Sequence, residues 1–208
     1  MNFDIKDLIR AHIESFTDVH EKIQAINQLR ILIHNHSPFK KEPADCVLWV
    51  ENKHIEANNY NPNVMAPVEK RLLAHSIIKN GFTQPIVTAY LKNTHFVVDG
   101  FHRQLLGRTK PSLYKRLSGY LPVTTIGSSH NQDEERIAAT IRHNRARGKH
   151  QVSAMSDIVR DLSRMGWGDK HISEELGMDQ DEVLRLKQIS GLTELFSDQE
   201  FSNAWTID

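Results

Sequence analysis

One short segment of the chain combines residue types that bind phosphate groups. In Val97-Val98-Asp99-Gly100-Phe101-His102-Arg103 an apolar strand pattern stops at a glycine, and a helical pattern follows at once. Such a junction directs backbone N–H groups and the positive end of the helix dipole outward, which favours an anion. Gly100 lets a ligand approach the backbone closely, and His102 and Arg103 add cationic donors. The segment therefore predicts a phosphate-binding turn.

A structural interpretation of the same residues stays open. Asp99 could cap the helix while Arg103 pairs with a surface carboxylate, because strand–glycine–helix turns are common. The surrounding sequence favours an anion, since residues 99–151 hold ten Lys or Arg against four Asp or Glu. Four of these cations follow an expected helix end, namely Arg142, Arg145, Arg147 and Lys149.

The elements that position this turn follow from periodicity and from turn residues. Residues 3–35 read as helix, with a second start where Glu21 follows Asp18 by three positions. Further helices are expected at 67–80, 101–107, 133–142, 150–165, 169–176 and 180–189. Strands are expected at 47–50, 85–90, 94–98 and 123–126, with the middle two joined by a turn at Lys92-Asn93.

This order of elements predicts an α+β fold in which a small mixed sheet carries a helical extension on each side. A polar, proline-bearing stretch from Ser37 to Pro43 reads as a linker. We therefore expect three parts: a helical extension at 1–44, a nucleotide-binding domain at 45–150, and a helical domain resembling a helix-turn-helix at 151–208.

Two motifs together resemble a known superfamily. Gly81-Phe82-Thr83-Gln84-Pro85-Ile86-Val87, followed by the segment 97–103, is similar to the ParB/sulfiredoxin superfamily. Its members carry a helix, a G-x-x-x-P-[IV] strand and a strand–G-x-x-R–helix phosphate loop at similar spacing. The resemblance covers roughly residues 47–150. The layout of the whole chain is most similar to the ParB-like coregulators called immunoglobulin-binding regulator B.

The resemblance implies a set of nucleotide-binding residues. Gly100, Arg103, Asn144 and Arg147 match the two phosphate-holding segments of ParB clamps that bind CTP. Phe101 and His143 stand where those clamps have glutamates, which weakens both the metal coordination and the preference for CTP. Phe101 also replaces the nucleophilic cysteine of sulfiredoxins, and Cys46 lies far away in sequence, so cysteine chemistry is not expected. The full set is Gln84, Gly100, Phe101, His102, Arg103, Asn144, Arg145 and Arg147.

A third branch of the superfamily, the free serine kinases, carries D-G-H-H-R, to which Asp99-Gly100-Phe101-His102-Arg103 is similar. In that branch the aspartate and an upstream glutamate serve catalysis. The resemblance therefore implies Asp99 as a catalytic residue, with Glu56 as its upstream partner and Glu51 as a weaker choice. The alternative for Glu56 is an ordinary loop carboxylate.

The segment from Gly168 to Ile189 reads as helix–glycine turn–helix, similar to the ParB helix-turn-helix. Ile172, Leu176, Val183 and Leu186 fall where that motif needs core residues. The second helix begins Asp179-Gln180-Asp181-Glu182, which would be repelled by DNA phosphates, and its cations are Arg185 and Lys187. Two interpretations compete. The motif is either a DNA reader that uses its acidic residues for cytosine contacts, with Arg185 and Lys187 as the DNA-binding cations, or a helix-turn-helix used for packing or protein contacts.

Bulk properties limit the remaining classes. Residues 1–151 carry 21 Lys or Arg and 14 Asp or Glu, while residues 152–208 carry 5 and 12, so the first part suits an anionic ligand. No apolar run reaches the roughly 18 residues of a membrane span, and a single cysteine is typical of the cytoplasm. Zinc-site spacings such as C-x-x-C are absent from the sequence, so no metal site is expected within the protein.

These observations predict a cytoplasmic, nucleotide-binding regulatory protein of the ParB-like type, acting on transcription or on a partner. The ligand is a nucleoside triphosphate or diphosphate such as ATP or CTP, with the base, a role for Mg²⁺ and hydrolysis left open. The alternatives are a small-molecule kinase that uses Asp99, and a DNA-binding protein with a vestigial nucleotide site. The closer resemblance implies a PAPS-reductase-like partner. DNA binding and a homodimer stay open, and no membrane partner is expected.

Overall fold

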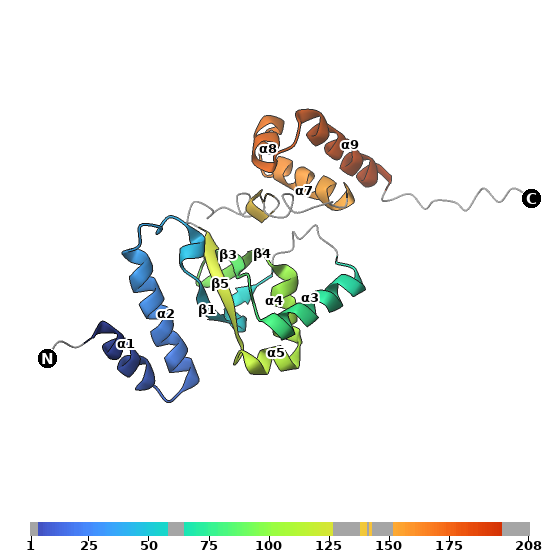
Figure 1. Ribbon diagram of the computed structural model, residues 1–208. Coiled ribbons are helices and arrows are strands. Elements are labelled where there is room, and N and C mark those ends of the chain that lie inside the picture. The colour runs from blue at the N-terminus through green and yellow to red at the C-terminus, as the bar shows by residue number, and fades with distance from the viewer. Residues whose placement is uncertain (1–3, 58–64, 127–137, 141, 143–151, 197–208) are drawn as a thin grey trace, which may run out of the picture. The chain divides into compact units, whose positions relative to one another are not determined.

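The computed structural model describes residues 4–57, 65–126, 138–140, 142 and 152–196 (Figure 1). These residues form two compact units, the first containing the described residues up to Ile126 and the second those from Ala138 onward. Most of the helix expected at 133–142 lies outside the described residues, although 138–140 and 142 are helical. No helix within the described part is long and apolar enough to cross a membrane.

The first unit is built on a mixed sheet of five strands in the order β1-β5-β3-β4-β2. Its strands are β1 Leu48–Glu51, β2 Ile55–Glu56, β3 Ile86–Leu91, β4 Thr94–Asp99 and β5 Tyr120–Ile126. The β3–β4 hairpin turns through Lys92 and Asn93, both at positive φ, as a two-residue hairpin turn requires. Because β3 and β5 run parallel while β4 and β1 run antiparallel to them, the fold class is the α+β class expected.

Strand β5 begins at Tyr120 rather than at the expected Val123. Pro122 interrupts the sequence pattern there, because a proline in a central strand removes a ladder hydrogen bond. The pairing of β5 with β3 starts only at Val123, so at Pro122 the ladder of β5 runs to β1 alone. The strand is therefore locally edge-like at its proline.

Two helices, α1 Ile5–Glu14 and α2 Val19–Asn35, precede the sheet in the sequence and belong to the same unit. Helix α2 lies beside β1 (Figure 1). Asp18 caps α2 by accepting hydrogen bonds from the backbone N–H groups of His20 and Glu21, which confirms the second helix start. The side chain of Asn27 donates to Trp49 O at 2.7 Å and accepts from Trp49 N at 3.0 Å. Helix α2 thus satisfies backbone groups of the outer strand β1, which would otherwise be open to pairing with another chain.

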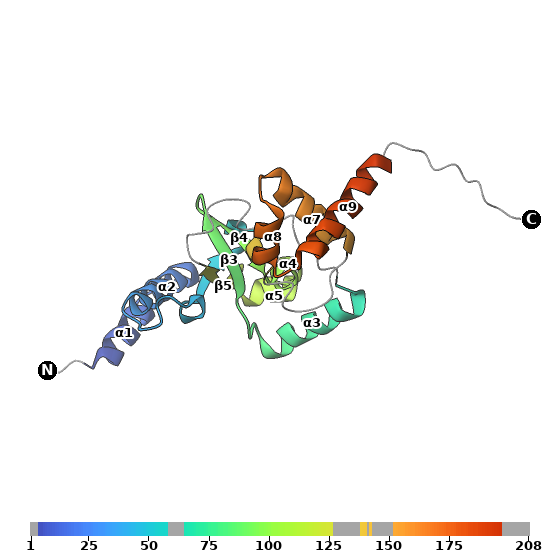
Figure 2. The ribbon, with the colours of Figure 1, turned by 90° about the horizontal axis from the view of Figure 1, so that it is seen from above.

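Three helices, α3 Pro67–Asn80, α4 Phe101–Thr109 and α5 Pro111–Arg116, lie on the other side of the sheet from α2 (Figures 1 and 2). Helix α3 begins at Pro67 and ends at Gly81, whose φ is +80°, as the proline and glycine predict. Two hydrophobic clusters join these layers. One consists of Ile55, Ile86, Val97, Leu121 and Val123, and the other of Ala74, Ile77, Leu106 and Leu113. Phe82 packs against both clusters and links them.

Strand β4 contains a half-buried histidine whose titration couples folding to pH. His95 Nδ1 lies 3.1 Å from Thr88 Oγ1, and its ring lies 4.7 Å from that of Tyr90. Burial, and secondarily the charge of His54, lowers the pKa of His95 from 6.5 to about 4.

Between pH 6.5 and 4 the unfolded chain therefore binds a proton that the folded chain excludes, so stability present above pH 6.5 is lost as the pH falls. We expect this histidine to remove about 2 kcal/mol of unfolding free energy over that window, reduced from the full shift because the ring is partly exposed. Urea titrations at pH 6.5, 5.5 and 4.5 measure this slope. A His95→Gln variant should flatten it, and an unchanged slope would contradict the assignment.

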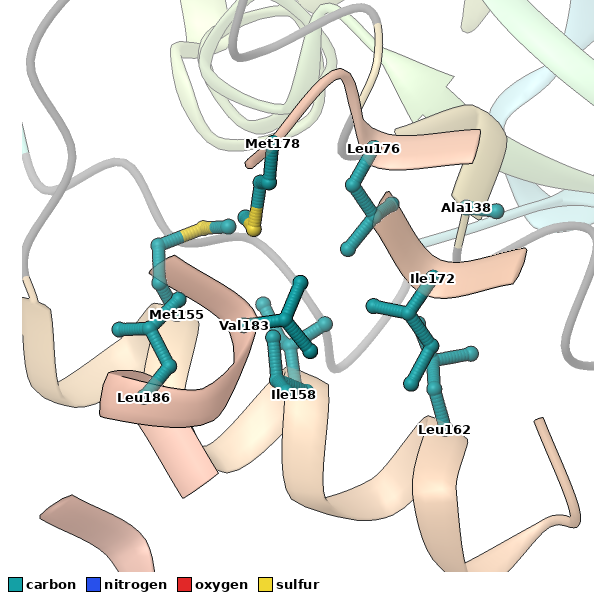
Figure 3. Close-up of a cluster of buried hydrophobic side chains, with 10 residues drawn as sticks. Ala138, Met155, Ile158, Leu162, Ile172, Leu176, Met178, Val183 and Leu186 are labelled. Carbon is teal, nitrogen blue, oxygen red and sulfur yellow. The ribbon is translucent and has the colours of Figure 1, made fainter. Parts of the chain in front are cut away.

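The second unit contains α7 Val152–Arg164, α8 Asp169–Leu176 and α9 Gln180–Phe196. These helices contribute to one cluster of buried hydrophobic side chains (Figure 3). Gly177 ends α8 in the left-handed conformation with φ +61° and forms the turn into α9. Ile172, Leu176, Val183 and Leu186 are buried, which confirms them as core residues of the motif. Met155, Ile158, Val159, Leu162, Met178 and Ala138 complete the cluster.

Two short elements of the first unit have no counterpart among the expected ones. Strand β2 has two residues and pairs in parallel with β4, and α5 has six residues. The 3-10 turns Pro43–Asp45 and Asn52–His54 are shorter than the periods that a sequence pattern can show. Tertiary contacts rather than local periodicity define all four.

Candidate phosphate-binding site

The turn between β4 and α4 has the geometry that its sequence predicts. Strand β4 ends at Asp99, opposite Val87 of β3, and α4 begins two residues later at Phe101. Gly100 between them is left-handed with φ +93°, a conformation that a residue with a Cβ rarely adopts. The first α-helical hydrogen bond runs from Gln104 N to Gly100 O at 2.9 Å. The backbone N–H groups of Phe101, His102 and Arg103 thus belong to the open first turn, and Gly100 has no side chain to cap it.

The guanidinium of Arg103 folds back over this turn. Its Nη2 donates to Asp99 Oδ2 at 3.3 Å, and its Nη1 donates to Gln84 Oε1 at 2.7 Å. A Cβ at position 100 would lie 3.0 Å from Arg103 Nε and Nη2, so the glycine is what lets the guanidinium pass. The side chains of Asp99 and Arg103 are 7% and 12% exposed, so their charges attract each other in a largely dry environment. The structure thereby brings Gln84, Asp99, Gly100 and Arg103 together.

The carboxylate expected to pair with Arg103 in the structural interpretation is therefore Asp99 itself, and it is buried rather than on the surface. Both interpretations of the turn remain compatible with this geometry, because an ion pair can hold an arginine in place until an anion arrives. At 3.3 Å the contact is longer than the 2.7–2.9 Å typical of charge-assisted hydrogen bonds. A phosphate oxygen could therefore replace the carboxylate as the partner of the guanidinium.

His102 lies in the first turn of α4, where α3 packs against it. Burial lowers the pKa of its imidazole, Lys70 of α3 lowers it further, and Glu69 opposes them. The neutral ring is therefore favoured near pH 7, which differs from the cationic donor expected from sequence. Its neutral ring can still donate one hydrogen bond. Positive charge at this turn comes from Arg103, and Lys70 of α3, a residue that the sequence reasoning missed, acts electrostatically on His102.

Phe101 is placed differently from the other candidates. Its ring packs against the cluster of Ile55, Ile86, Val97, Leu121 and Val123 and meets the ring of His102 edge-on, with ring centroids 5.2 Å apart. The side chain thus anchors the start of α4 to the sheet. Only its backbone N–H belongs to the open turn that a phosphate would meet.

The two glutamates considered as upstream carboxylates lie in different surroundings. Glu56 is exposed on β2, in register with Phe96, which precedes Asp99 by three residues on the adjacent strand. That offset corresponds to about 10 Å along a strand. Glu51 pairs with Lys53 at 2.6 Å, which lowers the pKa of its carboxyl. Neither arrangement places a glutamate in contact with Asp99, and the remaining candidates, Asn144, Arg145 and Arg147, lie outside the described residues.

The cations of the helix-turn-helix are not equivalent. Arg185 is exposed on α9, whereas Lys187 forms an ion pair with Asp169 at the start of α8. The start of α9 is acidic and exposed at Asp179 and Asp181. Within the described ranges, no group of three His, Cys, Asp or Glu side chains is arranged to hold a metal ion.

Comparison with known proteins gives the context for these two units. The family model of the IbrB-like C-terminal HTH domain matches residues 150–198, which confirms the helix-turn-helix and the similarity to immunoglobulin-binding regulator B in this part of the chain. The protein YbdM of Escherichia coli (strain K12), itself uncharacterized, is 59% identical over 188 residues, covering 90% of this chain and 88% of YbdM.

Three solved structures are similar at low identity. They are the Caulobacter crescentus chromosome-partitioning protein ParB complexed with CTP-gamma-S (14% identity, TM-score 0.39), the same protein complexed to the centromeric parS site (12%, 0.44), and a Pnob8-like ParB-N domain (11%, 0.47). They cover 72%, 73% and 74% of this chain, and the chain covers 83%, 79% and 73% of them. At these values the likeness carries no inference about ligands. The chain belongs to the family of Escherichia coli YbdM and carries an IbrB-like C-terminal HTH domain.

Proposed function

We propose that this chain is a nucleotide-binding regulatory protein whose phosphate site is the turn from Asp99 to Arg103. The observation that carries the proposal is the buried Asp99–Arg103 pair, held across a left-handed glycine at the open start of α4. The guanidinium of Arg103 passes close over Gly100 and lies beside backbone N–H groups of the first helical turn. Such an arginine is suited to a bidentate contact with phosphate. Asn144, Arg145 and Arg147 are further proposed ligands.

Phosphate binding at this turn would change the environment of Asp99. When the guanidinium moves from Asp99 Oδ2 to a phosphate oxygen, the carboxylate loses its charge partner next to the bound phosphoryl group. It could then orient water or a hydroxyl for attack, or hold Mg²⁺ together with phosphate oxygens. Hydrolysis would use water and kinase activity a substrate hydroxyl, and both would depend on the Asp99 carboxylate. Asp99→Asn should therefore abolish either activity while nucleotide binding persists.

The second unit supplies the regulatory part of the proposal. Residues 152–196 hold five Lys or Arg against nine Asp or Glu, and Lys187 is engaged by Asp169. On α9 this leaves Arg185, and one cation cannot neutralise several backbone phosphates, although it could contact a base. We therefore propose that this unit contacts a regulatory partner, or reads DNA only with help from cations elsewhere in the chain.

Thermal unfolding with a panel of nucleoside di- and triphosphates, each with and without Mg²⁺, tests the phosphate site. A ligand at one hundred times its Kd should raise the unfolding temperature by roughly 5–10 °C. Arg103→Lys keeps the charge beside Asp99 but loses the planar fork, so it should reduce the ligand-induced shift at least by half. The matched control is Arg108→Lys, exposed on the same helix, which should keep the full shift.

Absence of stabilisation by every nucleotide would overturn the proposal. So would a ligand-induced shift that Arg103→Lys and Arg108→Lys reduce to the same extent.

A further inference from the structure

The helical side of the first unit has an unusual charge composition. Residues 65–126 contain nine Lys or Arg but only two acidic residues, Glu69 and Asp99. Asp99 is buried against Arg103, and the Glu69 carboxylate accepts a hydrogen bond from Ala66 N at 3.0 Å. Both carboxylates thus have local structural roles, and most of the basic side chains lie in water.

Seven of these cations belong to α3, α4, α5 and the residue that joins α4 to α5. All seven are exposed: Lys70, Arg71, Lys79, Arg108, Lys110, Lys115 and Arg116. We call this set the basic band. Figure 2 shows the three helices as one group beside the sheet, and α4 packs against both of its neighbours.

The basic band has two ends on α3. At one end, Lys70 and Arg71 lie near the start of α3, which begins at Pro67 and packs against α4. At the other end, Arg116 donates to the carbonyl oxygens of Ile78 and Ile77 at 2.8 and 2.9 Å. Arg116 and its neighbour Lys115 therefore adjoin Lys79 in the last turn of α3. The members of the band on α3 extend from Lys70 to Lys79, nine residues apart and about 14 Å along the helix axis.

Helix dipoles account for part of this set, because Lys79, Arg108, Lys115 and Arg116 lie in the last turns of α3, α4 and α5. Lys70, Arg71 and Lys110 have no such role. No ion pair among the residues that the structure describes engages any member of the band, and like charges on adjoining helices repel one another. A surface of this kind is instead suited to a polyanion.

We propose that the basic band docks the phosphate backbone of duplex DNA without reading its sequence. Duplex DNA carries one negative charge per about 1.7 Å of its axis, so about 14 Å of band can face several phosphates. The exposed Tyr114 lies between Lys110 and Lys115 and offers a hydroxyl donor to the same backbone. DNA is favoured over an acidic protein because the chain carries an HTH domain whose own unit has a deficit of cations.

The test is fluorescence anisotropy of a labelled 30-base-pair duplex of random sequence with the full chain, over about 50–200 mM salt. The triple variant Arg71→Gln/Lys79→Gln/Lys115→Gln should lower affinity at least tenfold at the lowest salt. It should also reduce the slope of log K against log salt by about 2–3, near 0.9 per lost phosphate contact. Arg116 is kept because it also holds the end of α3.

The control variant is Lys6→Gln/Lys40→Gln/Lys92→Gln, which removes the same charge from exposed positions of the same unit outside the band. It should keep affinity within about twofold. Equal losses in the two variants, or wild-type affinity in the band variant, would overturn the proposal. Tighter binding of poly-glutamate than of the duplex at equal salt would also overturn it, in favour of an acidic protein. Nucleotide-induced stabilisation should persist in the band variant, so this result is separable from that of the phosphate site.

Discussion

Arg103→Ala is expected to lower the free energy of unfolding of the first unit by about 3 kcal/mol. The reason is the burial of its partner: the Asp99 side chain is 7% exposed, and without the guanidinium its charge lacks the compensation it has now. Gln84 Oε1 loses its 2.7 Å donor as well. Urea titration of the variant and of the wild type measures the difference through the transition midpoint.

Two further variants distinguish loss of the pair from loss of packing. Arg108→Ala, exposed on the same helix, should change stability by less than about 0.5 kcal/mol. Asp99→Ala/Arg103→Ala should be less destabilised than the sum of its single variants by about 1 kcal/mol or more, because it removes both charges. If Arg103→Ala lowered the free energy of unfolding no more than Arg108→Ala, the Asp99–Arg103 pair would not stabilise the turn as proposed.

Gly107→Val is the second change with a large expected effect, about 3 kcal/mol of destabilisation. A Cβ built at this helical glycine would overlap Cδ2 of Leu121 in β5 and would lie 3.3 Å from Cζ of Phe82. Leu121 is fully buried in the sheet cluster, so it has little room to withdraw. Gly107 thus sets the close approach of α4 to β5, and through it the position of the phosphate turn.

A second helical glycine, without close neighbours, should respond to substitution in the opposite direction. Gly191 of α9 has open space around its missing Cβ, so Gly191→Ala should stabilise its helix by up to about 1 kcal/mol. Adding Leu121→Ala to Gly107→Val should recover part of the lost stability, because it removes the overlapping methyl groups. Urea titrations of these variants provide the test, and a neutral Gly107→Val would contradict the close packing.

The sequence predicted the elements that begin or end at a proline, a glycine, an N-cap residue or a hairpin turn. Pro67 and Gly81 delimit α3 at both ends, Asp18 starts α2, and Lys92-Asn93 turns the hairpin, because each residue acts through its own backbone or its nearest neighbours. Elements defined by distant partners were not predictable in this way. Strand β2 exists only because β4 lies beside it, and the six residues of α5 are too few to show a helical period.

The same distinction holds within the candidate site. The left-handed Gly100 and the helix start after it follow from local sequence. The sequence did not identify the carboxylate that pairs with Arg103. A spacing of four residues across a glycine does not determine whether Asp99 or a surface carboxylate contacts the guanidinium. Gln84 was expected from the motif alone, and Lys70 carries no sequence signal, since it reaches His102 only through the packing of α3 on α4.

The central claim is that the turn from Asp99 to Arg103 binds the phosphates of a nucleotide, and backbone amide shifts test it most directly. In the ¹⁵N-labelled chain, titration with the nucleotide that stabilises it best should shift the amide signals of Gly100, His102 and Arg103 in a saturable way. Arg103→Lys should weaken that saturation several-fold. Saturable binding that leaves these amides unmoved while signals elsewhere in the chain shift would contradict the account.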